Sequence, residues 1–224
     1  MLVNTHNVFD DRKNEIEFYY SVMIDIDDES KHILNTIDNQ SFFRIMKSNF
    51  ILMLYNLVES TFTSGMAEIY DGFAQDICSY DSVIDEIQDI WRDSKIKQLY
   101  KSDSGLNTYT KQVKKLVDDI TRGVPLSLTK ETLGMNGNLN AKNIKKICDK
   151  HRIRYRVTDD NLVLDQVKKK RNSLAHGDES FGRCTRDLTT KDLENIKDTV
   201  LRFISEIVIA MDKYYDEKQY LRKK

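Results

Sequence analysis

Proline and glycine are scarce in this chain, with one proline and eight glycines among 224 residues. A β-rich fold needs many tight turns, which these two residues usually form, so their scarcity disfavours a sandwich or a barrel. Apolar residues make up 40% of the chain and charged residues 32%, a balance that favours long amphipathic helices. We therefore predict an all-α fold and, from the length, a single domain over residues 1–224.

Cysteines and long apolar segments are scarce too. The three cysteines, Cys78, Cys148 and Cys184, lack the close spacing of a zinc knuckle or a redox pair, which predicts reduced thiols. The longest apolar run, 50–55, is far shorter than the roughly 18 residues that a membrane-spanning helix needs. The first residues also lack the pattern of a secretory signal. These features predict a cytoplasmic protein that does not bind membranes.

The charges are unevenly distributed, although the net charge is only −1. Residues 1–30 carry eight acidic and two basic side chains, whereas residues 138–171 carry eleven basic and four acidic ones. An anionic ligand is therefore expected near the second stretch.

Apolar residues at helical spacing predict helices over about 10–29, 41–77, 83–99, 108–122, 162–176 and from 189 onwards. The helix over 41–77 is so apolar that it should be covered on most sides, and a break or kink at Gly65 or Gly72 is possible. Residues 126–160 are predicted to form a small irregular insertion, in which a basic helix is flanked by short alternating segments that could pair as two strands. The tail from Tyr220 onwards is expected to fray.

The segment VKKKRNSLAHGDESF, residues 167–181, contains the residues that are best suited to catalysis. On a helix, Asn172 and His176 share a face, whereas Arg171 lies about 140° away from His176. Gly177 can end the helix directly after the histidine. An arginine keeps its charge and can hold a phosphate with its planar fork, and a histidine can transfer protons near neutral pH.

This arrangement of arginine, polar residue and histidine, late in a helical chain and followed by a long last helix, resembles the signature of the HEPN superfamily. The resemblance implies a HEPN-like helical bundle and a stand-alone, metal-independent endoribonuclease of a toxin–antitoxin or antiphage defence system. Arg171, Asn172 and His176 would be its catalytic residues and RNA its substrate. It also implies a homodimer, in which two motifs form one composite cleft, and an antitoxin or defence-system partner protein.

Four other residues are predicted to support this site. Glu59 lies among apolar residues and needs a partner, for which Arg171 is the natural candidate, either to position the arginine or as a structural ion pair. Lys168, Lys169 and Lys170 adjoin the motif and could contact RNA. The basic residues over 142–156 could do so as well, or could form a solvated face.

Two other functions stay open. Some HEPN proteins bind nucleotides or proteins without cleaving RNA, and residues 138–157 could form a helix-turn-helix-like reader of DNA. We expect neither a metal ion nor a cofactor, because the sequence contains no HExxH, CxxC or Walker motif. A thiol nucleophile built on Cys184 and His176 is disfavoured, since nothing in the sequence marks that cysteine as activated.

Overall fold

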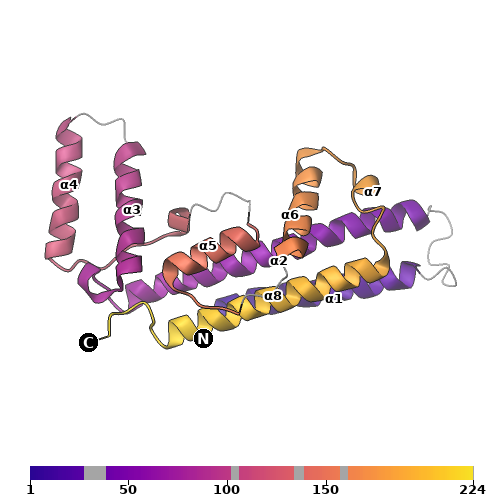
Figure 1. Cartoon of the computed structure of the whole chain (residues 1–224), viewed down its shortest axis with the longest axis horizontal. Helices are drawn as coiled ribbons and strands as arrows, with labels where there is room; N and C mark the ends of the chain where they lie inside the picture. Colours follow the sequence, from indigo (N-terminus) through magenta and orange to yellow (C-terminus); the bar gives the residue numbers. More distant parts are fainter. Residues whose placement is uncertain (28–38, 102–105, 134–138, 157–160, 224) are drawn as a thin grey trace.

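The computed structural model describes residues 1–27, 39–101, 106–133, 139–156 and 161–223. Its body consists of three long helices that lie side by side, α1 (Val3–Asp27), α2 (Asn39–Gln75) and α8 (Thr190–Asp216) (Figure 1). The other elements are short helices around α2: η1 (Tyr80–Ser82), α3 (Asp85–Lys101), α4 (Leu106–Thr121), η2 (Lys130–Leu133), α5 (Ala141–His151), α6 (Asn161–His176) and α7 (Phe181–Cys184).

The predicted all-α fold is confirmed, since the described residues contain no β-sheet. The core forms around α2, whose side chains Leu54, Phe62 and Met66 have no exposed surface. The helices α3 and α4 form a hairpin that projects from one end of this body (Figure 1). The three cysteines are free and buried. No helix in the described ranges is both long and apolar enough to cross a membrane.

Helix α1 begins at Val3 rather than near residue 10, where the sequence places its start. The first N–H groups of a helix have no partner within it, and here carboxylates from other helices accept their hydrogen bonds. Glu68 of α2 accepts from the backbone nitrogens of Asn4 and Thr5, at 3.2 and 3.0 Å. Asp212 of α8 accepts from that of Leu2 at 2.7 Å. Such caps come from tertiary structure and leave no local signal.

The two glycines of α2 do not break it, contrary to the expectation, because the helix is continuous through both. They instead allow α8 to approach closely. A Cβ atom at Gly65 would lie 2.5 Å from Sδ of Met211, and one at Gly72 would lie 2.4 Å from the ring of Tyr215. Both distances are too short for atoms that are not bonded.

The predicted pairing of two strands within 126–160 is wrong for the described residues, which form only helices and loops there. The alternating pattern reflects burial instead, because Leu126, Leu128 and Ile153 point into the core. Their segments bond elsewhere, as when the Leu126 nitrogen donates to the Cys78 carbonyl at 2.7 Å. The basic helix between them is confirmed as α5. Residues 134–138 and 157–160 of the predicted insertion lie outside the described residues.

The chain end is held in place, so the expectation that it frays is wrong for residues 220–222. Tyr220 is buried, and its hydroxyl donates to Asp76 at 2.6 Å. The backbone nitrogen of Arg222 donates to the carbonyl of Ser82 at 2.9 Å. The nitrogen of Ile84 donates to the Tyr220 carbonyl, and α3 begins one residue later, at Asp85.

His151 makes two hydrogen bonds, one within α5 and one that connects α5 to α2. Its Nδ1 lies 2.7 Å from the carbonyl of Ile147, to which it donates, so Nε2 accepts from the hydroxyl of Tyr70 at 2.8 Å. Burial lowers the pKa of His151 to about 4, although the bond to Ile147 opposes this shift. The folded state therefore holds a neutral imidazole.

We predict that acid will destabilise the protein through His151. Below pH 6.5 the histidine of the unfolded chain gains a proton, whereas buried His151 of the folded state stays neutral until the pH approaches 4. The free energy of unfolding therefore falls as the pH drops towards 4. At about 1.4 kcal/mol per pH unit, the loss between pH 7 and pH 4.5 is about 2–3 kcal/mol. Urea denaturation of the wild type and of His151→Gln isolates this term, because the other groups titrate in both. Equal losses in the two proteins would contradict it.

Candidate functional site

The predicted helix before Gly177 is confirmed as α6, and Arg171 lies on its buried face. Leu164, Val167 and Leu174 are buried on α6. Arg171 follows Val167 by four residues and precedes Leu174 by three, so it falls in the same row. This places a guanidinium against α2, where an apolar side chain would be expected.

Three contacts hold the guanidinium of Arg171. Its Cζ lies 4.1 Å from the ring centroid of Tyr55, a cation–π contact. Its Nη2 lies 3.5 Å from Oε2 of Glu59, and its Nη1 donates to Oδ1 of Asn172 at 2.9 Å. The contact between Glu59 and Arg171 that the sequence suggested is therefore present. The side chains of Arg171 and Glu59 remain 22% and 31% exposed, so solvent or a ligand can reach both.

Tyr55 fixes the surface on which the arginine lies. The residue is only 2% exposed, and its hydroxyl accepts a hydrogen bond from the backbone nitrogen of Leu139 at 3.0 Å. Burial raises the pKa of Tyr55, so the ring stays neutral near pH 7. Sequence reasoning treated this tyrosine only as an apolar neighbour of Glu59.

His176 occupies the last position of α6, and a glycine motif sets that end. Gly177 has φ +76°, its nitrogen donates to the carbonyl of Leu174, and the nitrogen of Asp178 donates to that of Ser173. These two bonds form a Schellman motif. The histidine is exposed, and this end of α6 points away from the long helices (Figure 1). Within the described ranges its imidazole has no hydrogen-bond partner.

Arg171 and His176 are offset along α6. His176 follows Arg171 by five positions, which corresponds to about 7.5 Å along the axis and about 140° around it. Asn172 lies between them, because it bonds to the arginine and precedes the histidine by one helical turn. The motif thus offers a held cation and an exposed imidazole in different directions.

The three lysines before the motif lie in different environments. Lys169 is exposed and Lys168 is half-buried, in the row of Asn172. The amine of Lys170 donates to the backbone carbonyl of Cys184, which joins α6 to α7. Burial raises the pKa of the Cys184 thiol to about 11, so this cysteine is not activated as a nucleophile.

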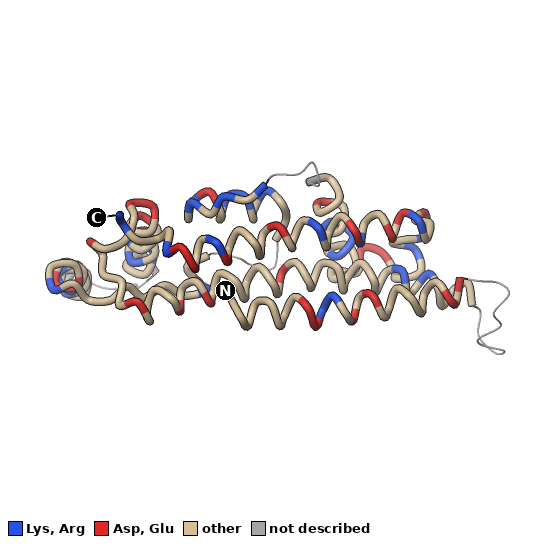
Figure 2. The backbone as a smooth tube through the Cα atoms, turned by 90° about the horizontal axis from the view of Figure 1, so that it is seen from below, with Lys and Arg blue, Asp and Glu red and all other residues tan. Residues whose placement is uncertain are grey.

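The basic run over 142–156 follows α5 and the segment after it (Figure 2). Its lysines and arginines are exposed. Some of these charges are paired, as in Lys145 with Asp149 and Arg152 with Glu86. Residues 152–160 separate α5 from α6, whereas a helix-turn-helix has a turn of three or four residues. This length disfavours the DNA-reading alternative.

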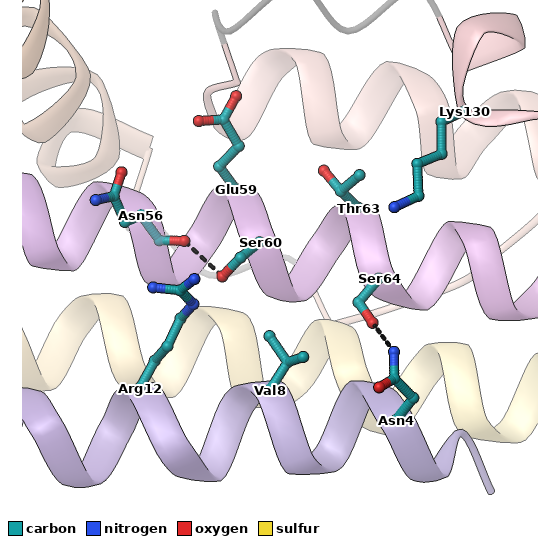
Figure 3. Close-up of a pocket in the computed structure, with 9 residues that line it drawn as sticks. All are labelled: Asn4, Val8, Arg12, Asn56, Glu59, Ser60, Thr63, Ser64 and Lys130. Atoms are coloured by element: carbon teal, nitrogen blue, oxygen red, sulfur yellow. Dashed lines mark hydrogen bonds between the residues drawn. The ribbon is translucent and has the colours of Figure 1, made fainter.

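A polar groove of about 780 Å³ opens between α1 and α2, beside the Arg171 site. Its lining comprises Asn4, Val8, Arg12, Asn56, Glu59, Ser60, Thr63, Ser64 and Lys130 (Figure 3). Sequence reasoning identified only Glu59 among these residues. A signal was nevertheless present, because Asn56, Ser60 and Thr63 follow one another by four and three residues along an otherwise apolar helix.

Metal-binding residues do not come together in the described part of the chain. No group of three histidine, cysteine, aspartate or glutamate side chains is placed there to hold an ion.

A helical body in which α6 ends on an arginine–asparagine–x3–histidine segment, followed by a long last helix, is an arrangement of the HEPN type. The family model described as HEPN_MAE_28990-like HEPN matches residues 1–220, and the chain belongs to this family of HEPN domains. Neither a curated protein nor a solved structure matches it.

We predict that Tyr55 contributes more to stability than the ion pair above it. Tyr55→Phe leaves the buried nitrogen of Leu139 without an acceptor, which costs about 1–3 kcal/mol. Glu59→Gln removes only a partly exposed ion pair, worth about 0–1 kcal/mol. Urea denaturation at pH 7 compares the two variants. A larger loss for Glu59→Gln would mean that the ion pair is the main anchor of α6.

Proposed function

We propose that this HEPN protein is a metal-independent endoribonuclease whose catalytic residues are Arg171, Asn172 and His176. The observation that carries the proposal is how the arginine and the histidine of the motif are placed. A guanidinium is fixed by Tyr55 and Glu59 while keeping exposed surface, and an imidazole stands free at the end of the same helix. A purely structural arginine would not need an accessible histidine five positions later on the same helix.

The reaction needs a base, an acid and a cation. A histidine removes the proton of a ribose 2′-hydroxyl, whose oxygen attacks the adjacent phosphorus. The bond from phosphorus to the 5′-oxygen breaks, and that oxygen receives a proton from a second acid. The products are a 2′,3′-cyclic phosphate and a 5′-hydroxyl, and no water is consumed. Arg171 stabilises the negative charge that develops on the phosphate oxygens.

The other residues have supporting roles in this proposal. Asn172 links the arginine to the histidine face of α6 and can donate its amide to a phosphate oxygen. Glu59 is a positioning residue, since it acts on the substrate through Arg171. Lys168 and Lys169 attract the RNA backbone, and Lys170 does so less than its charge suggests because its amine is bonded to α7.

The proposed site is composite and lies on the twofold axis of a homodimer. One chain supplies one histidine of this motif, whereas the reaction uses an acid and a base on opposite sides of the phosphorus. The offset between Arg171 and His176 along α6 supports the same assembly, because two motifs related by a twofold axis can direct one arginine and two histidines at a single phosphate.

The proposed setting is a toxin–antitoxin or antiphage defence system, and membership in the HEPN family supports it. An uncontrolled ribonuclease would harm its own cell, so the proposal includes a neutralising antitoxin or a defence-system partner protein. We further propose that residues 1–224 act as one domain in the cytoplasm, which is where the RNA substrate is found.

We predict that the purified protein cleaves single-stranded RNA in the presence of EDTA. The products should carry 2′,3′-cyclic phosphates, because the residues described supply both the charge and the proton transfers. His176→Ala should lower the rate by at least about 100-fold, since it removes a general acid or base. Asp178→Ala, at an exposed position two residues away, is the matched control. Strict dependence on magnesium, or products with 3′-hydroxyl ends, would contradict the mechanism.

We also predict that one inactive protomer inactivates the dimer. Heterodimers of wild-type and His176→Ala chains, isolated through two different affinity tags, should have far less than half of the wild-type rate. The reason is that the single composite cleft of each heterodimer would lack either its acid or its base. Heterodimers with Asp178→Ala chains control for the tags. Half of the wild-type rate would indicate two independent sites.

A further inference from the structure

The groove between α1 and α2 brings two cations to one polar surface. Figure 3 shows Arg12 reaching from α1 towards Asn56 and Ser60, while Lys130 of η2 enters from the other side of α2 towards Thr63. These cations are distant in sequence and come from different elements. Neither forms a salt bridge with a carboxylate in the described residues.

The surface between the two cations is neutral and able to form hydrogen bonds. The Ser60 hydroxyl donates to the carbonyl of Asn56 at 2.6 Å, and the amide of Asn4 donates to the hydroxyl of Ser64 at 2.9 Å. Each hydroxyl oxygen retains capacity to accept a further bond, and the side-chain amide of Asn56 is exposed. Such a surface suits sugar hydroxyls and phosphate oxygens.

The single carboxylate of the lining does not make the groove acidic. Glu59 lies 3.5 Å from Arg171, which compensates its charge and leaves Arg12 and Lys130 in excess. The lining contains no aromatic side chain, so the groove offers no surface on which a base could stack. The groove therefore suits a ligand that is recognised through its sugar and phosphate groups.

We propose that this groove binds a single-stranded RNA segment next to the phosphate that Arg171 holds. Arg12 and Lys130 contact two phosphates of the strand, and the polar residues of α2 between them contact the riboses. The groove has a volume of about 780 Å³. Glu59 lines the groove and also contacts Arg171, so the groove and the Arg171 site share this residue. The inference rests on the proposed function and adds the path of the substrate, which is read without regard to sequence.

The test measures binding of a fluorescent oligoribonucleotide of mixed sequence by anisotropy, in EDTA and in the His176→Ala background, where the RNA stays intact. Arg12→Gln and Lys130→Gln should each weaken binding about tenfold at every sequence tried. Each should also reduce the slope of log K against log salt by about 0.7, the value for one phosphate contact on a single strand. Arg12→Lys keeps the charge and should lose about threefold or less.

Matched controls separate a local effect from a change in net charge. Lys13→Gln changes an exposed lysine next to Arg12, and Lys97→Gln changes one on α3. Both should bind within about twofold of the parent protein, because they lie outside the lining. Thermal unfolding of all variants shows whether they fold, and Arg12→Lys serves if Arg12→Gln does not.

The outcomes separate the groove from the ribonuclease. Binding by Arg12→Gln and Lys130→Gln at the level of the controls overturns the groove, even if the wild type cleaves RNA. Loss of binding in these variants supports the groove, even if the wild type proves unable to cleave. If a mononucleotide binds tightly through both cations and the oligonucleotide does not bind, the proposal of a strand is wrong and the groove is a nucleotide site. If duplex DNA binds as tightly and loses as much affinity in Arg12→Gln and Lys130→Gln, the preference for a single strand is wrong.

Discussion

The burial of α2 is the constraint on which the rest of this structure depends. This helix is apolar around most of its circumference, so it is stable in water only when other elements cover it. Helices α1 and α8 cover two of its sides along their length, and α6 and α7 cover part of a third. The remaining polar stripe, with Asn56, Ser60 and Thr63, needs no cover and forms the groove. The position of the site follows from where this cover ends.

The charged residues at this boundary stay in place because aromatic and carboxylate groups replace the water that they lose. Arg171 occupies a position in the buried row of α6, and its contacts with Tyr55 and Glu59 compensate that burial. A similar arrangement occurs at Lys47, whose amine donates to the carbonyl of Leu188 at 2.6 Å and lies over the ring of Phe43. Desolvation lowers the pKa of this lysine. Cations at the edge of the α2 core are thus held by carbonyls and rings as well as by acids.

The features that the sequence predicts well are those set by neighbouring residues. The end of α6 at Gly177 and the capping box of Thr189 and Asp192 at the start of α8 depend only on residues within one turn, and both are present. The motif around Arg171 could be found for the same reason. The contact between Arg171 and Glu59 was inferred from one exception, a carboxylate among apolar residues.

The features that could not be predicted depend on residues far apart in the chain. The start of α1 depends on Glu68 and Asp212, and the fixed position of Tyr220 depends on Asp76. The groove requires α1 and η2 to place Arg12 and Lys130 along the same polar stripe of α2, which no local pattern encodes. The alternating apolar residues around Leu126 and Ile153 are buried, but burial of alternate residues does not require a second strand beside them.

The close contacts at Gly65 and Gly72 have a consequence for how far α8 can slide along α2. A shift of one helical turn, about 5.4 Å, would move Met211 or Tyr215 from a glycine to a residue that has a Cβ atom. The two glycines therefore fix the axial register of α8 against α2. Helix α7 precedes α8, receives the amine of Lys170 and bonds to Ser48 of α2. The position of His176 along α2 therefore depends in part on Gly65 and Gly72, through the contacts that connect α8, α7 and α6.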